Sequence, residues 1–260
     1  MSFNRIIEIE NTLRDFILYQ LRKKYNGDWQ KYYGISVDRI KKWEEKRDIA
    51  LKKSLKTGIV ESRLIYYSDF YDLSTIISKN WAALFKSVFE DKKEFDVYFK
   101  KMEEYRNTLA HGRLLLLHQS NLLEGICGEI RNKIIRYQSK MEYNVDIFPR
   151  IERVADNFGN VWPGFNSLHP KTTLFPGDIL EITINATDPE DQPLEFRIQN
   201  TTPWQRENTI KLFIENKHVC LRKVFNVLMR STRPYHSQVD RDGEVHLSYV
   251  ILPKKAQEIK

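Results

Sequence analysis

The sequence predicts an α+β protein in two domains, an N-terminal all-α helical bundle over residues 1–142 and a C-terminal antiparallel β-sandwich over residues 173–260. Up to about residue 140, apolar residues recur every three or four positions, which is the spacing of amphipathic helices. No proline occurs before Pro149, as expected for uninterrupted helices. After residue 172, apolar and polar residues alternate, which indicates strands. Residues 143–172 are rich in proline and glycine and are expected to form a linker or irregular segment.

Five helices are expected in the first domain, because capping residues and glycines divide the helical pattern. Ser36 is a suitable N-cap for the second helix and Ser68 or Asp69 for the third, and Gly27 and Gly112 are suitable helix ends. The expected helices contain residues 6–21, 37–55, 70–89, 95–109 and 122–134. In the second domain, polar turns separate short alternating segments. The expected strands are residues 179–184, 194–198, 210–214, 219–229 and 245–251.

The net charge of +7 is confined to the first domain. Residues 1–145 contain 27 Lys and Arg against 20 Asp and Glu, whereas residues 146–260 contain 15 of each. A basic domain beside a neutral one suggests that the first binds a polyanion such as nucleic acid. The alternative is that these lysines are ordinary solvated helix surface.

Composition disfavours membrane and secreted proteins. No apolar run approaches the ~20 residues that span a bilayer, and the N-terminus is not a signal peptide. The two cysteines, Cys127 and Cys220, form no visible disulfide framework. We therefore expect a cytoplasmic protein without membrane contact.

One segment near the end of the fourth expected helix combines residues suited to phosphodiester chemistry. Arg106, Asn107 and His111 lie directly before Gly112. Asn107 and His111 are spaced i, i+4 on one helix stripe, and Arg106 lies about 140° from His111. Histidine can hold and release a proton near neutral pH, and arginine can stabilise negative charge on phosphorus. These three are the candidate catalytic residues. The alternative is a buried polar contact between helices.

The same segment resembles a known superfamily. An all-helical domain that ends in Arg-Asn-x-x-x-His, followed by one more long helix, resembles the HEPN superfamily. The branch it resembles most is the Swt1-like HEPN domain, on the stretches Leu13–Ile17 and Tyr67–Leu73 and on Trp81. The resemblance covers residues 1 to about 140. The second domain resembles immunoglobulin-like or cadherin-like β-domains.

The resemblance implies a metal-independent endoribonuclease that acts on RNA as a homodimer, with Arg106, Asn107 and His111 as its catalytic residues and no cofactor. It also implies a prokaryotic toxin or anti-phage effector, whose partners would include an antitoxin or regulatory protein. Some HEPN domains only bind nucleotides or partners. The alternative is therefore a non-catalytic scaffold or binding module, with the β-domain as its recognition domain.

Metal sites are a weaker possibility. Asp188, Glu190 and Asp191, together with Asp240 and Asp242, lie in acidic turns that could bind calcium. Acidic residues are also ordinary turn formers. The histidines lack the spacing of zinc ligands, so no metal is expected in the catalytic site.

Overall fold

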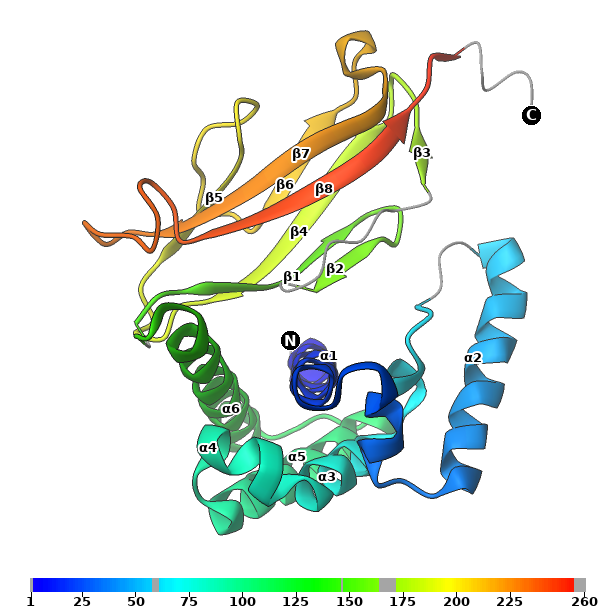
Figure 1. Ribbon diagram of the computed structural model, residues 1–260, viewed down its shortest axis with the longest axis vertical. Coiled ribbons are helices and arrows are strands. Elements are labelled where there is room, and N and C mark those ends of the chain that lie inside the picture. The colour runs from blue at the N-terminus through cyan, green and yellow to red at the C-terminus, as the bar shows by residue number, and fades with distance from the viewer. Residues whose placement is uncertain (1, 58–60, 146, 164–171, 255–260) are drawn as a thin grey trace. The chain divides into compact units, whose positions relative to one another are not determined.

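The computed structural model describes residues 2–57, 61–145, 147–163 and 172–254 (Figure 1). The chain divides into two compact units, Met1–Tyr137 and Gln138–Lys260. The first is helical, and the second contains all the strands of the described residues together with the last turns of the final helix. The predicted α+β class in two domains is confirmed.

The expected helices are present over the described residues, and short helical segments lie between them. They are α1 (Ser2–Tyr25), α2 (Val37–Thr57), α3 (Phe70–Lys79), α4 (Lys86–Phe89), α5 (Lys92–Ala110) and α6 (Leu117–Tyr143). The short segments are the 3-10 helices η1 (Asn26–Tyr33) and η2 (Leu64–Tyr67) and the π-helix η3 (Trp81–Phe85).

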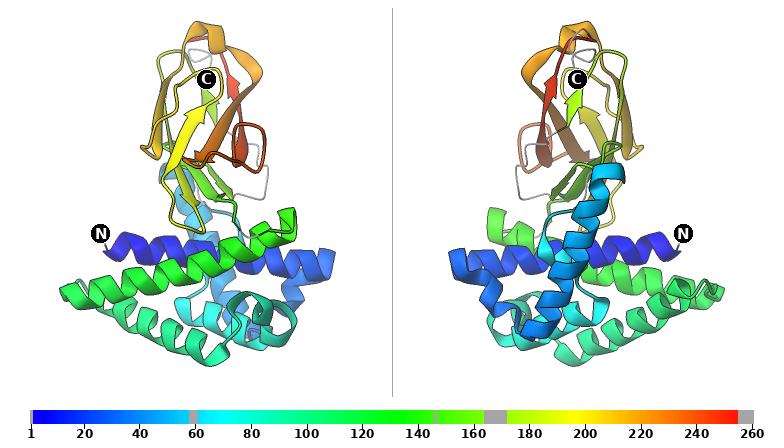
Figure 2. Two further views of the ribbon diagram at one scale, coloured as in Figure 1. Left: turned by 90° about the vertical axis from the view of Figure 1, so that its left-hand side faces the viewer. Right: turned by 90° about the vertical axis from the view of Figure 1, so that its right-hand side faces the viewer.

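The α1 helix forms the centre of the helical core. Ile9, Leu13, Ile17 and Leu21 are fully buried at spacings of four residues, so one stripe of α1 faces the core along the length of the helix. Figure 1 looks down this helix, which lies among α3, α5 and α6, and Figure 2 shows it from the side. Because α1 is central, its few polar inward side chains must find partners inside the unit.

The expected helix over residues 70–89 is divided into α3, η3 and α4. Of the two candidate N-caps, Ser68 and Asp69, the structure uses Asp69, which forms a capping box with Asp72. The division occurs at Asn80, whose side-chain amide donates to the carbonyls of Tyr32 (2.9 Å) and Ile76 (3.0 Å). The periodicity did not show this break, because apolar residues continue on both sides of Asn80.

The described residues of the second unit form two four-stranded sheets. The first has the order β2-β1-β4-β6, and the second has the order β3-β8-β7-β5. The strands are β1 (Arg150–Asp156), β2 (Val161–Pro163), β3 (Thr173–Leu174), β4 (Ile179–Thr187), β5 (Leu194–Ile198), β6 (Thr209–Phe213), β7 (Cys220–Ser231) and β8 (Gly243–Ile251). Inward side chains from both sheets form one hydrophobic cluster that includes Trp162, Ile182, Val227 and Tyr249.

Two expectations about this unit need correction. The described part of residues 143–172, expected to be a linker or irregular segment, contains the end of α6 and the paired strands β1 and β2, whereas residues 146 and 164–171 lie outside the described residues. A register shift between Ile151 and Arg153 breaks the period of two in β1, which hid the strand in the sequence. The sheets are also not purely antiparallel, because β3 pairs in parallel with β8.

Candidate functional site

The three candidate residues lie on the last turns of α5. Asp91 starts this helix by accepting hydrogen bonds from the backbone N–H groups of Lys93 (2.7 Å) and Glu94 (3.2 Å). Phe95, Phe99 and Met102 are buried on one face. The three candidate residues belong to the part of the helix that follows these anchors, towards its C-terminus.

His111 is exposed because of the way α5 ends. Gly112 adopts a left-handed conformation with φ +71°. Its N–H donates to the carbonyl of Leu109 (3.0 Å), and the N–H of Arg113 donates to the carbonyl of Thr108 (3.1 Å). This is the Schellman pattern, in which a glycine reverses the chain at the helix end. His111 is the last residue before the reversal, and its imidazole has no hydrogen-bond or ion-pair partner among the described residues.

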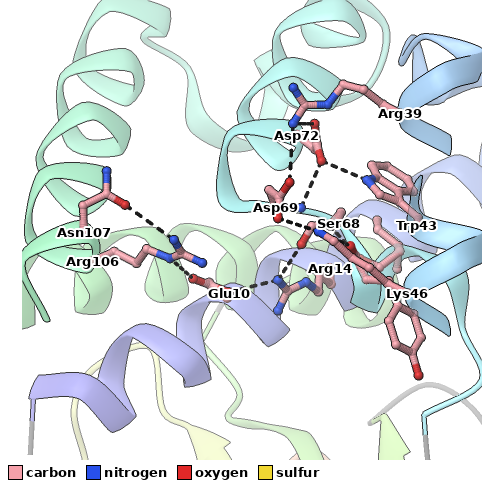
Figure 3. A network of polar contacts seen from close by, with 12 residues as sticks. Glu10, Arg14, Arg39, Trp43, Lys46, Ser68, Asp69, Asp72, Arg106 and Asn107 are labelled. Atoms are coloured by element: carbon pink, nitrogen blue, oxygen red, sulfur yellow. Dashed lines mark hydrogen bonds and ion pairs between the residues drawn. The ribbon is translucent and has the colours of Figure 1, made fainter. Parts of the chain in front are cut away.

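Arg106 is held in place from two sides. Its Nε lies 3.4 Å from Oε1 of Glu10 on α1, and its Nη1 donates to Oδ1 of Asn107 at 3.4 Å (Figure 3). The Arg106 side chain is 37% exposed, whereas Glu10 is 10% exposed. The guanidinium is thus anchored at its inner edge by a buried carboxylate and remains accessible from outside.

Glu10 is shared between two arginines. Its Oε2 accepts a hydrogen bond from Nη2 of Arg14 (2.9 Å), one turn later on α1. Nη2 of Arg14 also lies 3.2 Å from the carbonyl oxygen of Ser68, directly before α3. Two guanidinium groups around one carboxylate leave a net charge of +1 in the triad Arg14–Glu10–Arg106. A positive charge at this position is suited to binding an anion.

A second polar cluster adjoins this triad at the start of α3. Asp72 is fully buried and accepts from Nε1 of Trp43 (2.9 Å), and it forms an ion pair with Arg39 (2.6 Å). Asp69 forms an ion pair with Lys46 (2.8 Å). Figure 3 shows this cluster and the triad on either side of Ser68. The cluster connects α2 to α3, so the turn that holds Arg14 is itself fixed.

Exposed leucines follow the candidate residues. In the segment between α5 and α6, Leu114 is 91% and Leu116 is 62% exposed, and Leu117 at the start of α6 is 78% exposed. Three exposed leucines within four positions make this segment a candidate for an apolar contact with a partner. We refer to Leu114, Leu116 and Leu117 as the leucine surface.

The structure brings two of the three predicted residues into contact. It also adds two residues that were not predicted, Glu10, which contacts Arg106, and Arg14, which contacts Glu10. Arg106 and Asn107 contact each other, whereas no hydrogen bond links either side chain to the His111 imidazole in the described part of the chain. Glu10 and Arg14 were not predicted as site residues. Their signal in the sequence is an i, i+4 pair of opposite charges beside Ile9 and Leu13, which are both buried.

The acidic turns do not assemble a calcium site. Among the described residues, no group of three or more His, Cys, Asp or Glu side chains could hold a metal ion. Asp188 instead forms a buried ion pair with Arg233, whose guanidinium also contacts Glu190 (3.2 Å). Asp242 is fully buried and accepts from the N–H groups of Ser231 and Ser237, both at 2.8 Å. These carboxylates thus have partners within the protein.

Comparison with known proteins finds a similarity for the helical region. Residues 7–120 match the family model described as Swt1-like HEPN. No curated protein and no solved structure shows a significant match to the chain. This match suggests a nuclease-like or RNA-related function for the helical region. The described residues include no helix that is long and apolar enough to cross a membrane.

Proposed function

We propose that the N-terminal helical region, in which residues 7–120 match the Swt1-like HEPN model, is a metal-independent endoribonuclease that works as a homodimer. The observation that supports this most is that the last turns of α5 carry both an exposed imidazole, His111, and a partly exposed guanidinium, Arg106. Both groups are accessible to a substrate, and neither is sealed in the helical core.

The proposed reaction is attack of an RNA 2′-hydroxyl on the adjacent phosphorus. His111 moves a proton from the 2′-hydroxyl or to the leaving 5′-oxygen. Arg106 stabilises the additional negative charge on the phosphoryl oxygens in the transition state. Asn107 orients Arg106 or binds a phosphate oxygen. The products are a 2′,3′-cyclic phosphate and a 5′-hydroxyl, so DNA, which lacks the 2′-hydroxyl, is not cleaved.

Glu10 and Arg14 act as positioning residues for this chemistry. Glu10 fixes the Nε edge of Arg106, which leaves the rest of the guanidinium for the phosphate. Arg14 balances the charge of Glu10, so that the carboxylate does not cancel the positive charge of Arg106. A guanidinium that is already oriented loses less conformational entropy when it binds the transition state.

The homodimer supplies a second copy of the proton-transfer group. One imidazole cannot accept the 2′-hydroxyl proton and protonate the leaving oxygen in the same step, whereas two copies of His111 in one cleft can divide these roles. The leucine surface lies next to His111 in the sequence, and burying it against a second copy would remove exposed apolar area from water. We propose that this surface forms the dimer contact.

The test is cleavage of matched RNA and DNA oligonucleotides by the full chain in EDTA. We expect the RNA to be cut to products with 2′,3′-cyclic phosphate ends and the DNA to remain intact. Loss of activity in EDTA that returns with a divalent ion would contradict the proposed chemistry. No cleavage of any RNA would favour the non-catalytic scaffold, in which Arg106 serves only to join α5 to α1.

We further propose that the protein is a prokaryotic toxin or anti-phage effector that is controlled by an antitoxin or regulatory protein. Expression in a bacterial host should then slow growth, and the His111→Ala variant should relieve the effect at equal protein level. Equal growth with both proteins would argue against this role without affecting the cleavage assay.

A further inference from the structure

A second surface of the helical unit combines cations and aromatic rings, and the proposed chemistry does not use it. It lies where α1 ends and η1 begins. We name it the α1–η1 surface and define it by Arg22, Lys23, Lys24, Tyr25, Trp29, Lys31 and Tyr32. Between residues 16 and 36 the sequence has four Lys or Arg residues and one acidic residue, Asp28.

Three of the four cations of this surface are exposed to solvent. Lys23, Lys24 and Lys31 are exposed, and Lys24 has no ion-pair partner among the described residues. Cations in the last turn of α1 also interact favourably with the helix dipole. The helix dipole explains why lysines are found at positions 23 and 24. It does not explain why aromatic residues lie beside them.

The aromatic rings form an ordered, partly exposed group. Tyr25 and Tyr32 stack with centroids 3.6 Å apart and an interplanar angle of 3°. The guanidinium carbon of Arg22 lies 5.0 Å from the ring centroid of Trp29. Tyr32 is 44% exposed. A solvent-exposed tyrosine that is already stacked on one face is suited to stack a flat ligand on its accessible side.

Buried residues fix this group in place. Tyr33 contacts Trp29 edge-to-face at 5.7 Å and Trp43 at 5.6 Å, and both Tyr33 and Trp43 are buried. The backbone carbonyl of Tyr32 accepts a hydrogen bond from the Asn80 side chain (2.9 Å). The exposed rings are therefore held by the core and are preorganised for binding.

We propose that the α1–η1 surface binds single-stranded RNA and holds the substrate beside the cleavage site. Cations that contact the phosphates and aromatic rings that stack on bases are the combination by which proteins bind single strands. Duplex RNA hides its base faces, so it would use the cations but not Tyr32. This inference rests on the proposed function only in its choice of RNA as the ligand.

The surface and the cleavage site are linked by α1. Glu10, which contacts Arg106, and Arg22 lie 12 residues apart on this helix, and at 1.5 Å per residue they are separated by about 18 Å. In OB folds, which bind single strands by the same combination of cations and aromatic rings, one site accommodates about 4–16 nucleotides. A single strand of this length is long enough to extend over about 18 Å along α1, from the α1–η1 surface to the level of Arg106.

The test uses the full chain with His111→Ala, so that binding is measured without cleavage. A fluorescent single-stranded RNA of about 16 nucleotides is titrated at several salt concentrations. Tyr32→Ala removes the exposed ring without a change of charge. Lys24→Ala/Lys31→Ala removes two cations, and Lys42→Ala/Lys52→Ala, on exposed positions of α2, is the matched control. Thermal unfolding by circular dichroism verifies that each variant is folded.

We expect Tyr32→Ala to weaken RNA binding by about fivefold or more. The Lys24/Lys31 variant should lower the slope of log affinity against log salt by about 1.4, since each cation contributes about 0.7 for single strands. The Lys42/Lys52 control should leave both quantities near those of the parent. A folded Tyr32→Ala protein that binds RNA normally, or equal competition by inorganic polyphosphate, would overturn the proposal.

The outcome is independent of catalysis. If wild-type protein cleaves RNA but the surface variants bind it normally, the α1–η1 surface is excluded and the proposed function stands. If the surface variants lose RNA binding but wild-type protein cleaves nothing, the RNA site stands and the endoribonuclease is excluded.

Discussion

Glu10 on α1 and Arg106 on α5 form an ion pair across the helical unit, with Nε of the arginine 3.4 Å from Oε1 of the glutamate. The two residues lie 96 positions apart in the sequence, and Glu10 is almost fully buried between Arg106 and Arg14. Their contact connects the proposed chemistry at the end of α5 to the centre of the core.

Neutralising Glu10 should cost stability. Glu10→Gln leaves the buried Arg14 guanidinium without its carboxylate, and breaking a buried ion pair costs about 3–5 kcal/mol. We expect the free energy of unfolding, measured with urea, to fall by at least 2 kcal/mol, allowing for the retained hydrogen bond. Glu8→Gln is the matched control, because Glu8 is one-third exposed and its ion pairs should contribute less than about 1 kcal/mol. Equal losses in both variants would contradict the special role of Glu10.

Removing the His111 imidazole should leave the fold intact. The side chain is exposed and has no partner in the described part of the chain, so His111→Ala should change the free energy of unfolding by about 0.5 kcal/mol or less. A chemical denaturation curve measures this. His118→Ala, at another exposed position beyond the leucine surface, is the control for both stability and cleavage. A loss of 2 kcal/mol in His111→Ala would support a structural histidine.

Charging the leucine surface should separate the subunits. In the Leu114→Glu/Leu117→Glu variant, each subunit carries two negative charges on the proposed contact. These charges would repel the same two charges on the other subunit. We expect light scattering to report a dimer for wild type and a monomer for this variant, with cleavage lost in the monomer. The control is Val37→Glu, which places a charge at another exposed apolar position (69% exposed) outside the leucine surface. This variant should remain dimeric. A monomeric wild-type protein that cleaves RNA would contradict the two-copy mechanism.

Calcium should not stabilise the β-containing unit. Arg233 occupies the position beside Asp188 and Glu190 where a cation would be required. We expect the melting temperature to be the same in calcium and in EDTA. Arg233→Ala should cost about 3–5 kcal/mol, because it leaves the buried Asp188 carboxylate unpaired. Arg222→Ala, at an exposed position, should have an effect within about 0.5 kcal/mol. A rise in melting temperature with calcium would contradict this assignment.

Much of the fold could be predicted because its patterns are local. The N-cap Asp69, Gly112 at the end of α5 and the alternation in β4, β5 and β8 all depend on residues within a few positions. The division at Asn80 could not be predicted, because it depends on a carbonyl in η1, 48 positions earlier. The parallel pairing of β3 with β8 is equally non-local.

The candidate site could be predicted in part, because some of its residues are also close together in the sequence. Arg106, Asn107 and His111 fall in one short segment, so their spacing and their resemblance to a known motif were visible. Glu10 and Arg14 belong to a different helix, and only the packing of α1 against α5 brings Glu10 to Arg106. His111 is exposed because the chain reverses direction at Gly112. The sequence predicted Gly112 as the end of the helix, but it did not show that this reversal would expose His111.

The rate of RNA cleavage in EDTA by wild type, His111→Ala and Arg106→Ala is the most direct test of the central proposal. We predict that His111→Ala lowers the single-turnover rate by about 10²–10⁴ and that Arg106→Ala lowers it by about 10²–10³. Both proteins should remain folded by circular dichroism. Equal rates in all three folded proteins would show that cleavage, if present, takes place elsewhere, and would contradict the proposed site.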